Sequence, residues 1–104
     1  MNLFAEIRSL VISTLQELVA EGVLPAGLNF DPITAEPPRD AAHGDMATNA
    51  AMVLAKPAGM KARDIAENLA ARLTGNPWVT SVQVAGPGFL NLRLAPSVFS
   101  TAAS

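Results

Sequence analysis

The fold is decided by residues 78–95, WVTSVQVAGPGFLNLRLA. Apolar and polar residues alternate over residues 78–85 and again over residues 89–95, as they do in half-buried β-strands. The Gly-Pro-Gly segment between these two runs is typical of a tight turn. The stretch therefore predicts an antiparallel hairpin.

The two faces of this hairpin are expected to differ, because side chains alternate along a β-strand. The face turned toward the helices is expected to carry Thr80, Val82, Val84, Leu90, Leu92 and Leu94. The other face is expected to carry Ser81, Gln83, Phe89, Asn91 and Arg93. An aromatic ring can stack on an unpaired base, an amide can read a base edge, and a guanidinium can contact phosphate. Composition alone favours the simpler interpretation of a half-solvated strand with one exposed phenylalanine.

Outside the hairpin, three- and four-residue apolar spacing predicts helices. They are expected at residues 2–21, 46–56 with Asp45 as N-cap, 61–73, and from Pro96 onward over residues 96–103. A short strand is predicted at residues 33–36, ended by two prolines. The order α-β-α-α-β-β-α predicts an α+β two-layer sandwich, with helices packed on one face of a small antiparallel sheet and the other face open to solvent.

The composition limits the possible functions. The 104 residues are enough for one domain, and 50% are hydrophobic with only 15% charged, which excludes a disordered chain. The absence of cysteine excludes disulfides, thiolate metal sites and thiol catalysts. The net charge of −2 lacks the basic footprint of a free-standing nucleic-acid binder. No apolar run reaches the roughly 20 residues of a membrane span, and no signal peptide is recognised.

Catalytic and metal sites are not expected. The only histidine, His43, lies in a polar loop where Asp40 and Asp45 are the acids close in sequence. A general base or a metal ligand is conceivable there, but a structural role in the loop is favoured. Residues 86–88 do not form a phosphate loop, since they join two strands and no lysine or helix follows. We therefore expect no catalytic residue and no metal ligand.

Three segments resemble the N-terminal domain of arginyl-tRNA synthetases. They are residues 43–51 (HGDMATNAA), 64–66 (DIA) and 85–92 (AGPGFLNL). Their order and spacing are similar to the family across nearly the whole chain. The resemblance implies a domain at residues 1–95 that contacts the outer corner of the tRNA, at the D-loop. The family's contact residues carry over to Phe89 and Asn91, whereas Gln83 and Arg93 are added from strand geometry alone.

The resemblance also implies what the rest of the protein does. The family consists of class I synthetases that attach arginine to tRNA in protein synthesis. The expected partners are the arginine-accepting tRNA, bound weakly by this domain, and a catalytic core in the same chain, toward which residues 96–104 would begin a linker helix. ATP with Mg²⁺ would be used in that core, and no cofactor is expected in this domain. A cytoplasmic location and no membrane contact are expected.

An alternative function belongs to another class. The domain could be a docking module whose apolar surface packs on the catalytic core without touching RNA. The exposure of Phe89 discriminates between the two, because a ring that stacks on a base has to be open to solvent before it binds.

Overall fold

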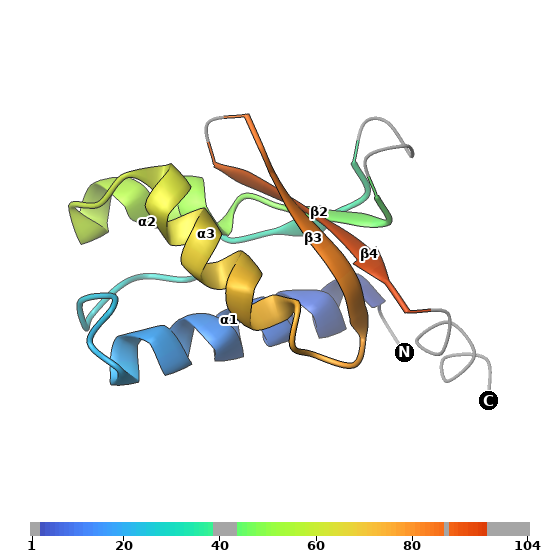
Figure 1. Ribbon diagram of the computed structural model, residues 1–104. Helices are drawn as coiled ribbons and strands as arrows, with labels where there is room; N and C mark the ends of the chain where they lie inside the picture. The colour runs from blue at the N-terminus through green and yellow to red at the C-terminus, as the bar shows by residue number, and fades with distance from the viewer. Residues whose placement is uncertain (1–2, 39–43, 87, 96–104) are drawn as a thin grey trace.

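The computed structural model describes residues 3–38, 44–86 and 88–95, and these residues form two layers (Figure 1). Within them, helices α1 (Leu3–Ala20), α2 (Ala50–Ala58) and α3 (Ala62–Leu73) accompany one four-stranded antiparallel sheet. Helix α3 packs on the hairpin, α1 packs on α3 and on the opposite edge of the sheet, and α2 lies beside α3 at one end of the sheet. The predicted α+β class and two-layer arrangement are confirmed.

The sheet has the strand order β1-β2-β4-β3. Its strands are β1 (Ala35–Glu36), β2 (Met46–Thr48), β3 (Val79–Ala85) and β4 (Phe89–Leu94). Strands β3 and β4 form the predicted hairpin, and β2 pairs with the other side of β4. Strand β4 is therefore an interior strand, which fixes its backbone on both sides.

The core lies between the sheet and the helices. Each helix turns one apolar stripe inward, as the spacing predicts. The largest fully buried side chains of α1, α3 and the inner sheet face include Ile7, Leu15, Leu18, Ile65, Leu69, Leu73, Met46, Leu90 and Leu92. Burying such side chains contributes about 1.5–3 kcal/mol each to the folded state before entropy is counted.

Strand β2 occupies residues for which a helix was expected. The prediction of a helix over residues 46–56 is wrong at its start, because Met46–Thr48 pairs with Leu90–Leu92 of β4 and α2 begins only at Ala50. Helical spacing of alanine and methionine gave no sign of this pairing, which is a tertiary effect. The helix then continues two residues past the expected stop and ends at Gly59, whose φ is 67°.

A bulge changes which residues of β3 face the core. Val79 pairs with Leu94 and Ser81 with Arg93, so Thr80 is an extra residue in β3. Val79 is buried and Thr80 is exposed, and the Thr80 hydroxyl donates a hydrogen bond to the Arg93 carbonyl oxygen at 3.1 Å. The prediction that Thr80 faces the helices is therefore wrong. The helix expected at residues 96–103 lies outside the described residues.

Gly44 and Asp45 tie the chain to β4 just before β2. The Asp45 backbone N–H donates to the Leu92 carbonyl oxygen at 2.8 Å, and its carboxylate accepts a hydrogen bond from the Leu94 N–H at 2.9 Å. A Cβ on Gly44 would lie 2.7 Å from the Leu92 oxygen. Asp45 thus supports the sheet. The prediction that it caps a helix is wrong. His43 and Asp40 lie outside the described residues.

Candidate nucleic-acid interface

The outer sheet face, turned away from α1 and α3, carries one cross-strand row of four residues. Glu36 pairs with Ala47, Ala47 with Asn91, and Asn91 with Gln83. Residues directly opposite each other in antiparallel strands project to the same side of the sheet. Phe89 and Arg93, two residues away from Asn91 along β4, lie on this face as well. The expected grouping of Ser81, Gln83, Phe89, Asn91 and Arg93 on one face is confirmed.

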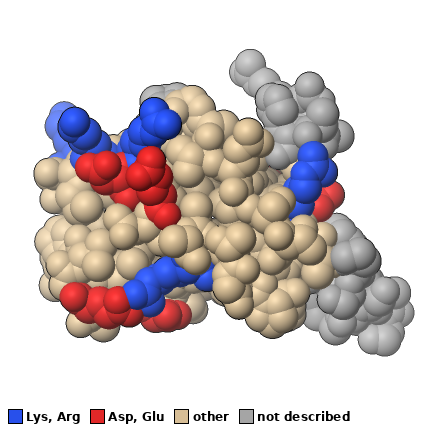
Figure 2. Space-filling view, in the orientation of Figure 1, with Lys and Arg blue, Asp and Glu red and all other residues tan. Residues whose placement is uncertain are grey.

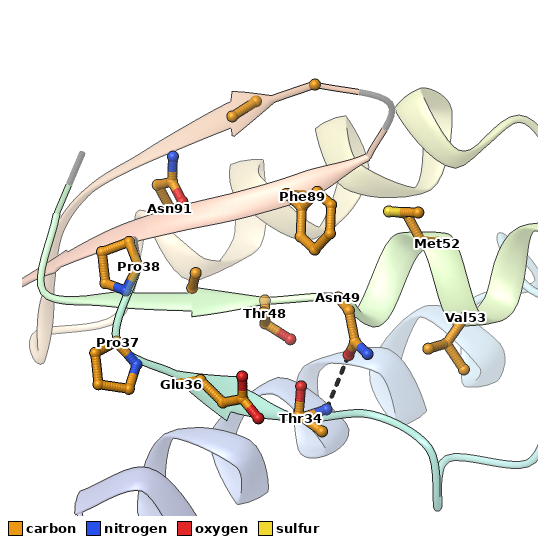
Figure 3. Close-up of a pocket in the computed structure, with 13 residues that line it drawn as sticks. Thr34, Glu36, Pro37, Pro38, Thr48, Asn49, Met52, Val53, Phe89 and Asn91 are labelled. Carbon is orange, nitrogen blue, oxygen red and sulfur yellow. Dashed lines mark hydrogen bonds between the residues drawn. The ribbon is translucent and has the colours of Figure 1, made fainter. Parts of the chain in front are cut away.

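This face is hollowed into a groove of about 1000 Å³ (Figure 3). Its walls come from the outer sheet face, the start of α2, and the segment that follows β1. The apolar part of the lining is Pro37, Pro38, Ala47, Met52, Val53, Ala85 and Phe89. The polar side chains of the lining are Thr34, Glu36, Thr48, Asn49 and Asn91. The outer face is therefore concave.

Hydrogen bonds from Asn49 hold two walls of the groove together. Its side-chain oxygen accepts a hydrogen bond from the Thr34 N–H at 2.8 Å, drawn as a dashed line in Figure 3, and its side-chain nitrogen donates to the Pro32 oxygen at 3.4 Å. Asn49 stands at the start of α2, whereas Thr34 leads into β1. This amide therefore fixes the position of β1, and of Glu36 on it, relative to α2.

Close packing at the hairpin end positions Phe89. A Cβ on Gly88 would lie 2.7 Å from the Ala62 Cβ and 3.2 Å from the Met52 Cγ. Glycine therefore lets the hairpin approach the corner between α2 and α3, which brings the adjacent Phe89 into the same wall as Met52. Both side chains remain 40% exposed. Two large apolar groups thus stay open to solvent at one end of the groove.

Asn91 lies at the floor of the groove. The residue is only 8% exposed, yet none of the described residues forms a hydrogen bond with its side-chain amide. The described buried side-chain nitrogens and oxygens that are sealed from solvent all have partners. The Asn91 amide atoms therefore still reach the groove.

Gln83 and Arg93 share the outer face but not the groove. Gln83 is exposed directly across from Asn91, and Arg93 is exposed one pair further along, opposite Ser81. Neither side chain lines the groove. Of the four residues proposed from the sequence, the structure therefore brings Phe89 and Asn91 together in the groove and leaves Gln83 and Arg93 on its margin.

Most other groove residues escaped the sequence reasoning. The sequence assigns Pro37 and Pro38 only to the end of a strand. Met52 and Glu36 had no assigned role. Their position depends on the pairing of β2 with both β1 and β4, which carries residues 34–38 alongside the outer face. The sequence analysis did not predict the strand at Met46–Thr48, so it could not place these residues on the outer face.

The described basic side chains lie outside the groove. Figure 2 shows some of them at the end of the molecule where α2 and α3 meet, and the described basic residues near that corner are Lys56, Lys61 and Arg63. Arg72 pairs with Glu17 and Glu21, and Arg8 donates to the carbonyl oxygens of Phe30, Asp31 and Ile33. Among the described residues that line the groove, only Glu36 is charged, and its carboxylate disfavours a phosphate beside it.

The described residues contain no group of three or more His, Cys, Asp or Glu side chains that could hold a metal ion. None of the described helices combines the length and apolar character needed to cross a bilayer.

Comparison with known proteins identifies the family. The model of the arginyl-tRNA synthetase N-terminal domain matches residues 5–94. The chain belongs to this family. Its relatives include an arginine–tRNA ligase of Ruegeria sp. (strain TM1040), 69% identical over 99 residues, and one of Ruegeria pomeroyi, 66% identical over 99 residues. In both cases the match covers 95% of this chain and 17% of the relative.

A third relative is the arginine–tRNA ligase of Paracoccus denitrificans, which is 69% identical over 94 residues, or 90% of this chain and 16% of the relative. The chain thus spans about one sixth of the length of these ligases. The resemblance inferred from residues 43–51, 64–66 and 85–92 is confirmed, and with it the assignment of the chain to an N-terminal domain.

Proposed function

We propose that this chain is the tRNA-recognition domain of an arginine–tRNA ligase, and that it contacts the D-loop at the outer corner of the tRNA through its groove. Phe89 stacks on an unpaired base, and the Asn91 amide forms hydrogen bonds with the edge of a base. Gln83 and Arg93 contact the RNA beside the groove. Arginine activation with ATP and transfer to tRNA belong to the catalytic core of the same protein.

The observation that carries this proposal is the Asn91 amide. It is 8% exposed, has no hydrogen-bond partner among the described residues, and lies two residues from a Phe89 ring that is 40% exposed. Unpaired RNA bases are recognised by this combination of stacking on an aromatic ring and hydrogen bonding to the base edge. The edge of a base can exchange hydrogen bonds with this amide, because the amide atoms reach the groove.

The acidic net charge is compatible with this function. A domain joined to a larger RNA-binding protein acts at a high effective concentration, so it needs little affinity of its own. Phosphate contacts elsewhere in the ligase can supply affinity, while this domain supplies selectivity through base contacts. The net charge of −2 therefore argues against a free-standing RNA binder but not against a tethered one.

Arginylation kinetics of the full-length ligase test the proposal. Asn91→Ala is expected to raise KM for tRNA roughly tenfold, since a good base contact is worth about 1–3 kcal/mol. The value of kcat at saturating tRNA is expected to stay unchanged, because the amide is remote from the chemical step. Gln16→Ala, an exposed amide on α1, is the matched control and should leave both constants unchanged. An unaltered KM in Asn91→Ala would contradict the proposal.

Docking on the catalytic core is the other function that the groove could serve, because its lining is largely apolar. Phe89, whose exposure was expected to discriminate between the two functions, is 40% exposed, as base stacking requires. The acidic Glu36, and the Asn91 amide with which none of the described residues forms a hydrogen bond, favour a polar ligand over an apolar protein surface.

A further inference from the structure

Glu36 is the one charged residue among the described residues that line the groove, and neither the sequence motifs nor the proposed Phe89 and Asn91 contacts use it. Its side chain is exposed on β1, and none of the described residues forms an ion pair or hydrogen bond with its carboxylate. An acidic side chain in a surface that binds RNA is unfavourable unless it makes a specific contact, because it repels the phosphates. Its position therefore needs an explanation.

Glu36 and Asn91 lie on opposite sides of a small residue. Both pair with Ala47 of β2, one from β1 and the other from β4 (Figure 3). Neighbouring strands are about 4.8 Å apart, so the backbones of Glu36 and Asn91 are separated by about 10 Å. Only a methyl group projects between them from Ala47, which leaves the floor of the groove open. Glu36 and Asn91 therefore border the same open stretch of the groove, from opposite sides of Ala47.

The chemistry of the two groups selects what can enter. An ionised carboxylate only accepts hydrogen bonds, whereas an amide both donates and accepts. A phosphate brings acceptors and negative charge, so Glu36 repels it. The edge of a base with an exocyclic amino group brings N–H donors beside ring acceptors, and both Glu and Asn pair with such groups.

The geometry points to Glu36 as a specificity-determining residue, whose carboxylate accepts a hydrogen bond from the exocyclic amino group of the base that Asn91 reads. This inference rests on the proposed function of the groove. Glu36 excludes phosphate from the groove and favours adenine, guanine or cytosine over uracil, which has no amino group. Ala47 is required to be small, since a larger side chain would fill the space between the two polar groups.

The sign of the effect of Glu36→Gln tests this inference in the full-length ligase. Glutamine keeps the size of the side chain and removes the negative charge. If Glu36 only repels RNA, the substitution strengthens tRNA binding, as loss of a negative charge near RNA generally does. If Glu36 accepts a hydrogen bond from the base, KM for tRNA rises about fivefold, because the glutamine oxygen accepts only the weaker, neutral hydrogen bond. Glu6→Gln, at an exposed position of α1, makes the same charge change away from the groove and should leave KM for tRNA unchanged.

A second measurement checks the class of base. Arginine tRNAs are prepared in which each unpaired base of the outer corner is replaced in turn by its analogue without the amino group: inosine for guanosine, purine riboside for adenosine, and 2-pyrimidinone riboside for cytidine. For the unsubstituted ligase, we expect KM to rise at one position. For Glu36→Gln, the same replacement should cost much less, because the contact is already weakened.

Ala47→Leu is a further variant that removes no polar group. It should raise KM for tRNA as strongly as Asn91→Ala while leaving kcat unchanged. A Glu36→Gln enzyme whose KM falls or stays constant overturns the role of Glu36, and if Asn91→Ala still raises KM the proposed function survives. If Asn91→Ala is also without effect, the groove does not read the tRNA and both proposals are wrong.

Discussion

One face of β4 is buried and the other is open to solvent, although the side chains of both faces alternate along the same six residues. Leu90 and Leu92 are fully buried under the helices, whereas Phe89 and Arg93 are exposed, and none of the described residues forms a hydrogen bond with the Asn91 amide in the groove. The inner face packs its side chains within the domain. The outer face leaves an aromatic ring and an amide open to the groove. Substitutions on the inner face should therefore change stability, and those on the outer face should change RNA binding.

The largest stability effect is expected at the inner face. Leu92→Ala should lower the free energy of unfolding by about 2–5 kcal/mol, because it leaves a cavity beneath α3 and opposite Met46. Urea denaturation of the 104-residue chain measures this loss. A loss below 1 kcal/mol would mean that the two faces do not differ in the way described.

A somewhat smaller loss of stability is expected for a substitution at Gly44, which packs against the backbone of Leu92 in β4. Gly44→Ala should cost about 2–3 kcal/mol, because φ is +143° and the new Cβ would lie 2.7 Å from the Leu92 oxygen. Gly27→Ala is the control, since Gly27 also has a positive φ but no atom within 4 Å of the position of a Cβ. It should cost only about 1 kcal/mol, for backbone strain alone. Equal losses would show that the approach to Leu92 is unimportant.

Asp45 is expected to contribute less than Gly44. Asp45→Ala removes the acceptor of the Leu94 N–H and should lower the free energy of unfolding by about 1–2 kcal/mol. Asp31→Ala, on an exposed loop, is a suitable control and should change stability by less than about 0.5 kcal/mol. Both values come from the same denaturation measurements.

The smallest stability effect is expected on the outer face. Asn91→Ala should change the free energy of unfolding by less than about 0.5 kcal/mol, because none of the described residues forms a hydrogen bond with the amide. A clear destabilisation, above 1 kcal/mol, would indicate that Asn91 supports the fold and would blur the contrast between the two faces of β4.

Local patterns predicted much of the fold but little of the groove. The alternation over residues 78–95 gave the hairpin, and the spacing in residues 61–73 gave α3 almost to the residue. Strand β2 is only three residues long and obtains its partners from β1 and β4, so no local period marks it. The groove depends on that pairing, and its Glu36 and Met52 could not be assigned from sequence. Phe89 and Asn91 could, because they lie on the strongly patterned strand.

The central claim is that the outer face of β4 binds tRNA, and a photoreactive crosslink tests it most directly. A benzoylphenylalanine residue in place of Phe89 in the full-length ligase keeps an aromatic group at the end of the groove. The same replacement at Phe4, which is 44% exposed on α1, is the control. Irradiation with arginine tRNA is expected to join position 89, and not position 4, to the outer corner of the RNA. Crosslinks from position 89 only to the protein's own chain would contradict the account and indicate docking on the catalytic core.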